Sequence, residues 1–384
     1  MPIHIGKPYI RQEADRTYLC ALLKNNEQEE EAWFSVEPEY ASGLTWERSD
    51  AFVIGFLTTA MRDGEDIFCE APITKRLHYQ LTTYLIPTIA ANMPVYHAIT
   101  IHAPVAEDPL PCEGGVATGW TGGVDSMYTL MGHIRTAQPG YRLTHLLIAN
   151  NGALEGKHCR QNLDNMVSLA RQGIARDLGL GVIGIDSNLH ILQNENYLSV
   201  AVFRLCAVVL AVQKLLRVFL HSAGGDFSLF KLDPENSALY EVLPLSCFET
   251  DNTHFYTAGG AASRMQKLEE MADFAPAQNY LHPCIYVGRT NCGTCLKCMR
   301  TMTGLYSLGV LEKFQNVFDV ERFSRQKEDY FFQLLNHGDH PLHAEILRSM
   351  QRRGVPIPPE ALRRARIRRA ATIVAQRNLK PKED

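Results

Sequence analysis

The fold is decided by the stretch Val116-Ala117-Thr118-Gly119-Trp120-Thr121-Gly122-Gly123-Val124-Asp125-Ser126, which a run with helical spacing follows from Met127. A short apolar segment, two adjacent glycines and an Asp-Ser pair predict a strand, a tight loop and a helix N-terminus. Such a loop suits an anion, because glycines let the backbone approach a phosphate and the first N–H groups of the helix face the same point. Thr121 and Ser126 add hydroxyl donors, and Asp125 is a candidate carboxylate for Mg²⁺. An ordinary strand-to-helix turn is the plain alternative.

The composition sets outer limits on the kind of protein. With 384 residues, 46% hydrophobic and 21% charged, the chain can bury a substantial core and should form two or three domains. A net charge of -4 argues against a strongly basic nucleic-acid binder. The longest apolar candidates for a membrane span are interrupted by Arg204, Lys214 and Arg217, and the N-terminus lacks the sectors of a secretion signal. We therefore expect a cytoplasmic protein with no membrane partner.

Strand and helix patterns alternate through the middle of the chain. Strand candidates at 143–150, 182–186 and 218–222 alternate with helical patterns at 162–178 and 198–216. This alternation predicts an α/β fold with a doubly wound parallel sheet. Ligands of such sheets bind beyond the carboxyl ends of the strands, where this chain has small or polar residues. Each of these segments could be just a turn, but together they favour a nucleotide cleft.

The first part of the chain, residues 1–112, is predicted to be a separate α+β domain. It has strand candidates at 18–23 and 32–36, a helix at 50–62, a strand at 66–70, a helix-start signal at Pro72 and a helix at 77–91 that Pro87 should kink or divide. It contains no catalytic constellation. We interpret it as a substrate-shaping or partner-contacting domain.

Four of the ten cysteines are clustered, at Cys284, Cys292, Cys295 and Cys298. Four thiolates form a closed tetrahedral set that suits structural Zn²⁺ and leaves no open position for a substrate. An iron–sulfur cluster is the competing interpretation, because spacing alone does not identify the metal. The other six cysteines lie mostly in apolar runs, where a free cysteine usually packs as a small hydrophobe.

Two of these features together resemble a known family. Thr-Gly-Gly-Val-Asp-Ser is similar to the Ser-Gly-Gly-x-Asp-Ser/Thr signature of the PP-loop ATP pyrophosphatases, which have a HUP-like fold, with Thr121 in the place of the usual Ser. A downstream Cys-x7-Cys-Gly-x-Cys-x2-Cys segment adds a resemblance to the QueC (7-cyano-7-deazaguanine synthase) branch, which carries a four-cysteine zinc site. The resemblance covers about residues 115 to 303.

The resemblance implies an AMP-forming ligase. Such enzymes use ATP to adenylylate the carboxylate of 7-carboxy-7-deazaguanine, release pyrophosphate and join the acyl group to nitrogen as an amide or nitrile. It implies that Asp125 and Ser126 act in catalysis, with Arg264 and Lys267 neutralising the leaving pyrophosphate; without the resemblance, the last two would be a solvated helix face. The implied ATP-binding residues are Trp120, Thr121, Gly122, Gly123, Val124, Asp125, Ser126, Ile148, Asn150, Gly224 and Gly225.

The substrate is less well defined by the resemblance than the chemistry. The usual Pro-x-Arg-Asn-like base-recognition segment is missing from 188–197, and the chain is longer than a housekeeping QueC. Enlarged relatives occur in antiphage operons of the CBASS type IV kind, where the resemblance suggests that a deazaguanine carboxylate is joined to a protein amine. The expected partners are therefore a deazaguanine-like carboxylate, with a protein amine acceptor and a second copy in a homodimer as further candidates.

The remaining part of the chain divides into a core domain and a tail. Residues 113–303 are predicted to be the PP-loop domain with its zinc site, which the resemblance covers from about residue 115. Residues 304–384 are predicted to be a C-terminal helical region, and helices are expected at 300–314 and 321–335. A basic segment at 363–369, with Lys380 and Lys382 beyond it, could bind RNA, a membrane surface or an acidic partner, or be an exposed helix.

Two other functions stay open. One is a tRNA sulfurtransferase with a persulfide on Cys159 or Cys247, and the other is a non-catalytic nucleotide-binding module.

Overall fold

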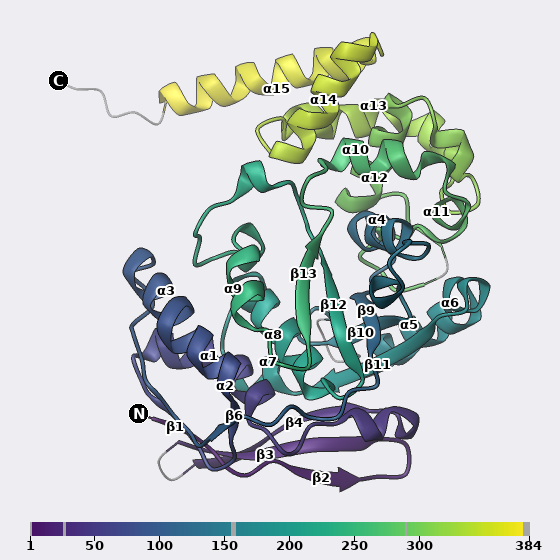
Figure 1. Cartoon of the computed structure of the whole chain (residues 1–384). Coiled ribbons are helices and arrows are strands. Elements are labelled where there is room, and N and C mark those ends of the chain that lie inside the picture. Colours follow the sequence, from purple (N-terminus) through teal and green to yellow (C-terminus); the bar gives the residue numbers. More distant parts are fainter. Residues whose placement is uncertain (1, 26–27, 155–158, 289, 379–384) are drawn as a thin grey trace, which may run out of the picture. The chain divides into compact units, whose positions relative to one another are not determined.

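The structure is a computed structural model that describes residues 2–25, 28–154, 159–288 and 290–378 (Figure 1). The chain divides into two compact units. Unit 1 takes in residues 1–121 and 128–261, and unit 2 takes in residues 122–127 and 262–384. The predicted domain boundaries after residues 112 and 303 stay predictions.

Unit 1 is built on one large sheet, in which eleven strands are found among the described residues. Its strands are β1 (Ile3–Ile5), β2 (Tyr9–Gln12), β3 (Thr17–Asn25), β4 (Gln28–Val36), β5 (Ile67–Cys69), β7 (Ile101–His102), β9 (Gly115–Gly119), β10 (His145–Asn150), β11 (Gly181–Ser187), β12 (Leu216–Ser222) and β13 (His254–Ala258). Their order is β13-β12-β9-β10-β11-β4-β3-β1-β5-β7, with β2 paired to β3. Strands β6 (Ile73–Thr74) and β8 (Val105–Ala106) form a separate pair.

The sheet is mostly parallel. The parallel pairs form two groups: β13-β12-β9-β10-β11 and β1-β5-β7. Between these groups, β4 pairs antiparallel with β11 and with β3, and β3 also pairs antiparallel with β1 and β2. The prediction of an α/β fold is thus confirmed as a mixed α/β fold with a large, mostly parallel sheet. Strands from both sides of residue 112 share this sheet, because β4 pairs with β11.

Helices surround this sheet (Figure 1). They are α1 (Asp50–Asp63), α2 (Lys75–Gln80), α3 (Ile86–Asn92), α5 (Cys159–Gln172), α6 (Ile174–Leu178), α7 (Leu189–Leu192), α8 (Tyr197–Ala211) and α9 (Val242–Cys247). The core contains the fully buried rings of Phe34, Phe52 and Phe203. Helix α8 is buried along most of its length because its residues are apolar on nearly every side.

Three predicted elements of unit 1 differ in their ends. The helix expected over 198–216 ends at Ala211, and Leu216 already belongs to β12. Pro72 precedes the short strand β6, and the helix begins only at Lys75. Pro87 does divide the next helix: a π-helical turn, Leu81–Leu85, separates α2 from α3, because proline cannot donate a hydrogen bond to the preceding turn. Strand β13 had no counterpart among the predicted elements.

Unit 2 is helical in its described part. Its helices are α10 (Arg264–Glu270), α11 (Ala275–Tyr280), α12 (Leu296–Ser307), α13 (Val320–Asn336), α14 (Pro341–Arg353) and α15 (Pro359–Asn378), and it also holds the first residues of α4 (Val124–His133). Helices α12 and α13 contact each other through aromatic side chains: the ring centroid of Tyr306 on α12 lies 5.4 Å from that of Phe323 and 5.8 Å from that of Phe331, both on α13. Both correspond to predicted tail helices, whereas α14 was not predicted.

The basic segment lies on α15. Arg363 pairs with Glu360 of the same helix, and Arg364 pairs with Asp329 and stacks on the ring of Phe332 at 4.4 Å. Part of the basic charge is therefore used inside the chain. Over the residues that the structure describes, none of the helices has the length and apolar character that crossing a membrane requires.

Candidate functional site

The glycine loop has the predicted strand-loop-helix arrangement. Strand β9 ends at Gly119, the N–H of Trp120 still donates to the Leu147 carbonyl at 2.8 Å, and α4 begins at Val124. Gly122 has a φ of +72°, a conformation that residues with a Cβ rarely adopt. The hydroxyl of Ser126 donates to the carbonyl oxygen of Gly123 at 3.1 Å. The helix α4 therefore begins two residues after a sharp backbone turn at Gly122.

The loop is attached to the segment that leads into the cysteine cluster. The N–H of His282 donates to the Gly122 carbonyl at 2.7 Å. A Cβ added at Gly122 would lie 3.2 Å from the Cβ of His282. Both the backbone conformation and the close approach of His282 thus require glycine at this position.

Asp125, in the first turn of α4, forms ion pairs with two side chains of α10. Its Oδ2 lies 2.9 Å from Arg264 Nη2, and its Oδ1 lies 3.0 Å from Lys267 Nζ. Helix α10 is well fixed, since Ser263 and Gln266 form a reciprocal capping box at its start. The side chain of Lys267 is only 1% exposed and that of Asp125 is 22% exposed. The structure therefore brings together three of the four predicted catalytic side chains, and Ser126 follows Asp125 directly.

A third cation, Arg300, acts on the same group. Helix α12 crosses α10 closely, because a Cβ added at Gly304 would lie 2.7 Å from Leu268 Cδ1. Burial, together with the nearby charge of Arg264, lowers the pKa of Arg300 to about 10, while Asp125 acts in the opposite direction. Arg300 is not among the predicted site residues; its position two residues after Cys298 is the only sequence signal that could have pointed to it.

This group, which we call the cation cluster, comprises Asp125, Arg264, Lys267 and Arg300. Within this cluster there are three cations and one carboxylate. Partly buried cations beside a helix N-terminus provide a strong environment for a phosphate or another anion. Both oxygens of Asp125 are already engaged by cations. Any Mg²⁺ held by this carboxylate would share it with them.

The other predicted ATP-binding residues lie in unit 1, along the carboxyl ends of neighbouring strands. Ile148 is buried within β10, Asn150 ends that strand, and Gly224 and Gly225 follow the end of β12. The Asn150 amide donates to Asp186 Oδ1, at the end of β11, at 2.7 Å. The side chain of Ile148 is packed in the core, so a contact through its backbone stays a prediction.

The four clustered cysteines can hold a metal ion. The sulfur atoms of Cys284, Cys292, Cys295 and Cys298 all lie within 4.8 Å of one another. Cys292 and Cys298 are 3.9 Å apart, close to the spacing of about 3.8 Å that four bonds of about 2.3 Å around one tetrahedral ion produce. An iron–sulfur cluster holds its thiolates around several atoms, so this tight grouping fits a single ion such as zinc better.

The backbone supports thiolates at this cluster. Burial acts against ionisation of Cys292, but the N–H groups of Thr294 and Cys295 point at its sulfur and lower its pKa to about 6. The loop is fixed from outside: the Asn291 amide donates to the carbonyls of Leu281 and Val317, both at 2.9 Å. Cys295 also caps the N-terminus of α12, the helix that carries Arg300. The donor set is therefore consistent with a closed structural site.

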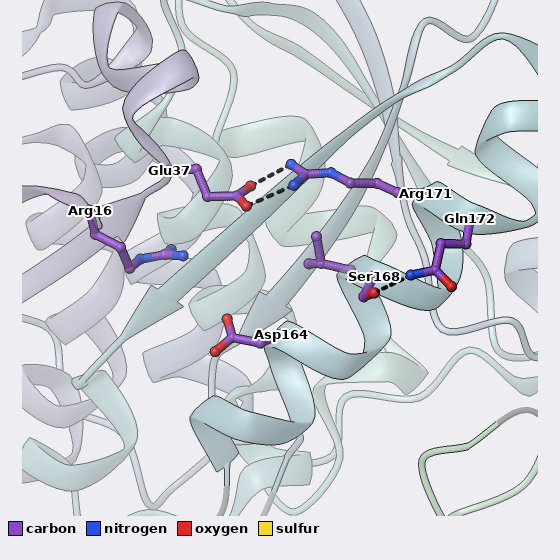
Figure 2. Close-up of a pocket in the computed structure, with 7 residues that line it drawn as sticks. Arg16, Glu37, Asp164, Ser168, Arg171 and Gln172 are labelled. Atoms are coloured by element: carbon purple, nitrogen blue, oxygen red, sulfur yellow. Dashed lines mark hydrogen bonds and ion pairs between the residues drawn. The ribbon is translucent and has the colours of Figure 1, made fainter. Parts of the chain in front are cut away.

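A separate hollow of about 350 Å³ opens in unit 1 beside α5 (Figure 2). Figure 2 shows Glu37 and Arg171 paired across it and Gln172 bonded to Ser168. Its charged side chains have partners within the chain, Glu37 and Arg171 with each other, Arg16 with Ser35 and Asp164 with Arg160, and none of the predicted site residues lines it. We assign it no function.

The two cysteines considered for a persulfide lie in unit 1. Cys159 is the first residue of α5, and Cys247 is buried at the end of α9. Burial raises the pKa of the Cys247 thiol, whereas a nucleophilic cysteine needs a lowered pKa.

Comparison with known proteins identifies no relative: no family model, no curated protein and no solved structure matches this chain.

Proposed function

We propose that this protein is an ATP-dependent, AMP-forming ligase of the PP-loop type, which adenylylates a carboxylate and joins the acyl group to a nitrogen nucleophile. One observation carries the proposal. Two cations of α10, Arg264 and Lys267, pair with Asp125 in the helical turn that directly follows the glycine loop, and the charge of Asp125 also acts on Arg300 of α12. The loop N–H groups and these cations suit the phosphates of ATP.

The proposed reaction has two displacements. A carboxylate oxygen attacks the α-phosphorus of ATP, the bond from that phosphorus to the bridging oxygen breaks, and pyrophosphate leaves with the electron pair. The nitrogen nucleophile then attacks the carbonyl carbon and loses a proton, and AMP leaves with the electrons of the C–O bond. Lys267, Arg264 and Arg300 neutralise the charge that develops on pyrophosphate, and the glycine loop holds the phosphates in line.

The cofactors of this proposal have distinct roles. Asp125, which would share its carboxylate with Arg264 and Lys267, would hold Mg²⁺, and the ion would supply further charge neutralisation at the phosphates. Zinc at the four cysteines has a structural role, since four thiolates leave no position for a substrate. The proposed adenine contacts are the backbone of Ile148 and Asn150, with Gly224 and Gly225 near the activated intermediate.

The resemblance to the QueC branch supports 7-carboxy-7-deazaguanine as the first carboxylate to test. The nitrogen donor is then ammonia, giving an amide that a second adenylylation by ATP converts to a nitrile with release of AMP, or it is an amine on a protein, as in the enlarged relatives of antiphage operons. A cytoplasmic location belongs to the same proposal.

The test is to incubate the purified protein with Mg-ATP and 7-carboxy-7-deazaguanine, with and without ammonium, and to follow AMP and the base by mass spectrometry. We expect AMP formation that depends on the base, and conversion of the base to an adenylate, amide or nitrile. Lys267→Met should lower the rate by about 10²- to 10³-fold, the usual effect of removing one such charge-stabilising group. Lys313→Met removes an exposed lysine that pairs with Asp273 and serves as the matched control.

Two outcomes would count against the proposal. Absence of AMP with this base and with other carboxylates would remove the ligase assignment, and ATP binding without turnover would favour the non-catalytic module. Equal rates in Lys267→Met and the wild type would show that the cation cluster takes no part in the chemistry.

A further inference from the structure

Arg204, in the second turn of α8, is a buried cation with few partners. It is 2% exposed, and its only hydrogen bond to described residues runs from Nε to Gln193 Oε1, at 2.6 Å. Its Nη2 is buried and has no partner among them. A buried guanidinium is expensive unless a carboxylate or several oxygens compensate it, so this arrangement requires an explanation.

Arg16 shows how the same unit compensates a buried arginine. It is also 2% exposed. Its Nε donates to Ser35 Oγ at 2.8 Å, and its Nη2 donates to the carbonyl oxygens of Ser35 and Gly184. Two side chains of equal burial therefore differ in that Arg16 has three oxygen acceptors and Arg204 has one.

A neighbouring acidic side chain does not make up the difference. Glu195 is the acidic group whose charge acts on Arg204, but its Oε2 pairs with Arg62 at 3.2 Å, and its Oε1 accepts from the Thr59 hydroxyl at 2.5 Å. One carboxylate is thus shared by two guanidinium groups. Burial lowers the pKa of Arg204, as expected for a cation that lacks a close counter-ion.

The guanidinium lies at a place where α/β sheets bind ligands. Its Nη1 would be 2.8 Å from a Cβ added at Gly152, a residue with a φ of +99° that comes two positions after the end of β10. His190, just beyond the end of β11, lies against the same glycine. The carboxyl ends of neighbouring parallel strands are the usual ligand edge of such a sheet.

Two more buried polar atoms at this edge have no partner among the described residues. They are His190 Nδ1 and Asn150 Oδ1. The Asn150 amide nitrogen is already bonded to Asp186, so the free carbonyl oxygen can accept a hydrogen bond from a ligand N–H. The guanidinium of α8 and an acceptor without a donor, Asn150 Oδ1, therefore both lie next to the segment in which β10 ends.

We propose that this edge of unit 1 is a binding site for a small molecule that carries a carboxylate and an N–H group, with Arg204 pairing with the carboxylate and Asn150 Oδ1 accepting the N–H. The inference rests on the proposed function, because the carboxylate it holds is that of the substrate. Arg204 and Asn150 are then the residues that recognise the substrate, whereas the cation cluster of unit 2 acts on ATP. In this proposal the side chain of Asn150 binds the substrate N–H, whereas its backbone contacts the adenine of ATP.

The test compares two ligands that differ only in the carboxylate. Binding of 7-carboxy-7-deazaguanine and of 7-deazaguanine to the full chain is measured by isothermal titration calorimetry for the wild type, Arg204→Met and Arg16→Met. We expect Arg204→Met to bind the carboxylate compound about 10- to 100-fold more weakly, the value of one charge-assisted pair, and 7-deazaguanine unchanged. Arg16→Met should keep the wild-type preference for the carboxylate.

Unfolding of the ligand-free protein gives a second measurement. Because Arg204 lacks a counter-ion, Arg204→Met should have a melting temperature equal to or above that of the wild type, whereas Arg16→Met should have a lower one. Gly152→Ala should reduce carboxylate binding as well, since its Cβ would displace the guanidinium. A wild type without preference for the carboxylate compound, or an Arg204→Met variant that binds it normally, would overturn the inference.

The same set of proteins separates this inference from the proposed function. AMP formation that is equal in the wild type and Arg204→Met would leave the ligase in place and remove the Arg204 site. If carboxylate binding depends on Arg204 but the wild type forms no AMP, the result supports the Arg204 site and contradicts the proposed ligase function.

Discussion

Asp125→Asn should have opposite effects on the stability of the protein and on its affinity for pyrophosphate. In the wild type, Asp125 is the carboxylate that compensates Lys267 and Arg264, at 3.0 and 2.9 Å, with Arg300 nearby. The substitution keeps the size of the side chain and removes its charge. Arg264 and Lys267 then lose this carboxylate as an ion-pair partner, and an incoming anion can take its place.

The size of both effects can be estimated from the geometry. Breaking a buried ion pair typically costs about 3–5 kcal/mol. Asp125 is 22% exposed and asparagine keeps one carbonyl oxygen as an acceptor, so we expect the free energy of unfolding to fall by about 2–3 kcal/mol. Removing one negative charge about 4 Å from an anion changes its energy by about 1–4 kcal/mol at surface-like dielectric constants, which corresponds to at least fivefold tighter binding of pyrophosphate.

Guanidinium unfolding followed by circular dichroism gives the first quantity, and calorimetric titration with pyrophosphate gives the second. The titration is carried out without added Mg²⁺ and without a chelator, which would also remove a metal from the cysteines. Asp273→Asn is the control: Asp273 is 85% exposed and pairs with Lys313, so its loss should change the stability by less than about 1 kcal/mol. Unchanged stability in Asp125→Asn, or weaker binding of pyrophosphate, would refute the reasoning.

Three further predictions concern the loop, the metal and pH. Gly122→Ala should destabilise the protein by about 1–3 kcal/mol and weaken ATP binding, because the residue has a φ of +72° and faces His282; Gly132→Ala, in open space on α4, should be neutral or stabilising in the same unfolding and ATP titrations. Cys295→Ser should reduce the zinc content measured by mass spectrometry and lower the melting temperature; an unchanged metal content would contradict the four-thiolate site. Burial lowers the pKa of His145, so the imidazole of the unfolded chain becomes protonated at a higher pH than that of the folded chain. The contribution of neutral His145 to stability should therefore be complete above about pH 6.5 and decline below it. The unfolding midpoint of His145→Gln should depend less on pH between about 7.5 and 5 than that of the wild type.

The parts of the site that could be predicted from the sequence are those whose determinants lie close together in the chain. The turn between Gly119 and Val124 follows from adjacent glycines between a strand and a helix, and the metal site follows from cysteines within fifteen residues of one another. Local backbone preferences and ligand spacing are enough in both cases. The same reasoning placed β10, β11 and β12 correctly, because each is a short apolar run between polar turns.

The cation cluster could not be predicted in this way, because its members are far apart in the sequence. Arg264 and Lys267 are 139 and 142 positions from Asp125. On their own helix they look like a solvated face, and only the family resemblance suggested that they act with Asp125. Arg300 depends in addition on the close crossing of α10 and α12 at Gly304, which is a tertiary contact.

Arg204 illustrates a different limit. In the sequence it is the only charge within a long apolar run, which indicates that the run does not cross a membrane. Hydrophobic periodicity cannot show whether such a charge reaches solvent, pairs internally or waits for a ligand. A similar ambiguity explains the predicted end of this helix at 216: Gln213 is fully buried and bonded to Asp50, so the apolar pattern continues through the turn into β12.

The hydrogen bond from His282 to Gly122 joins the glycine loop to a peptide that reaches the first metal ligand only two residues later. An ion bound by the cysteines would restrict the conformations of the glycine loop that a phosphate encounters. By reciprocity, the factor by which the ion tightens nucleotide binding is also the factor by which the nucleotide tightens binding of the ion. Protein with ATP bound would then keep its zinc at lower free zinc concentrations than protein without ATP.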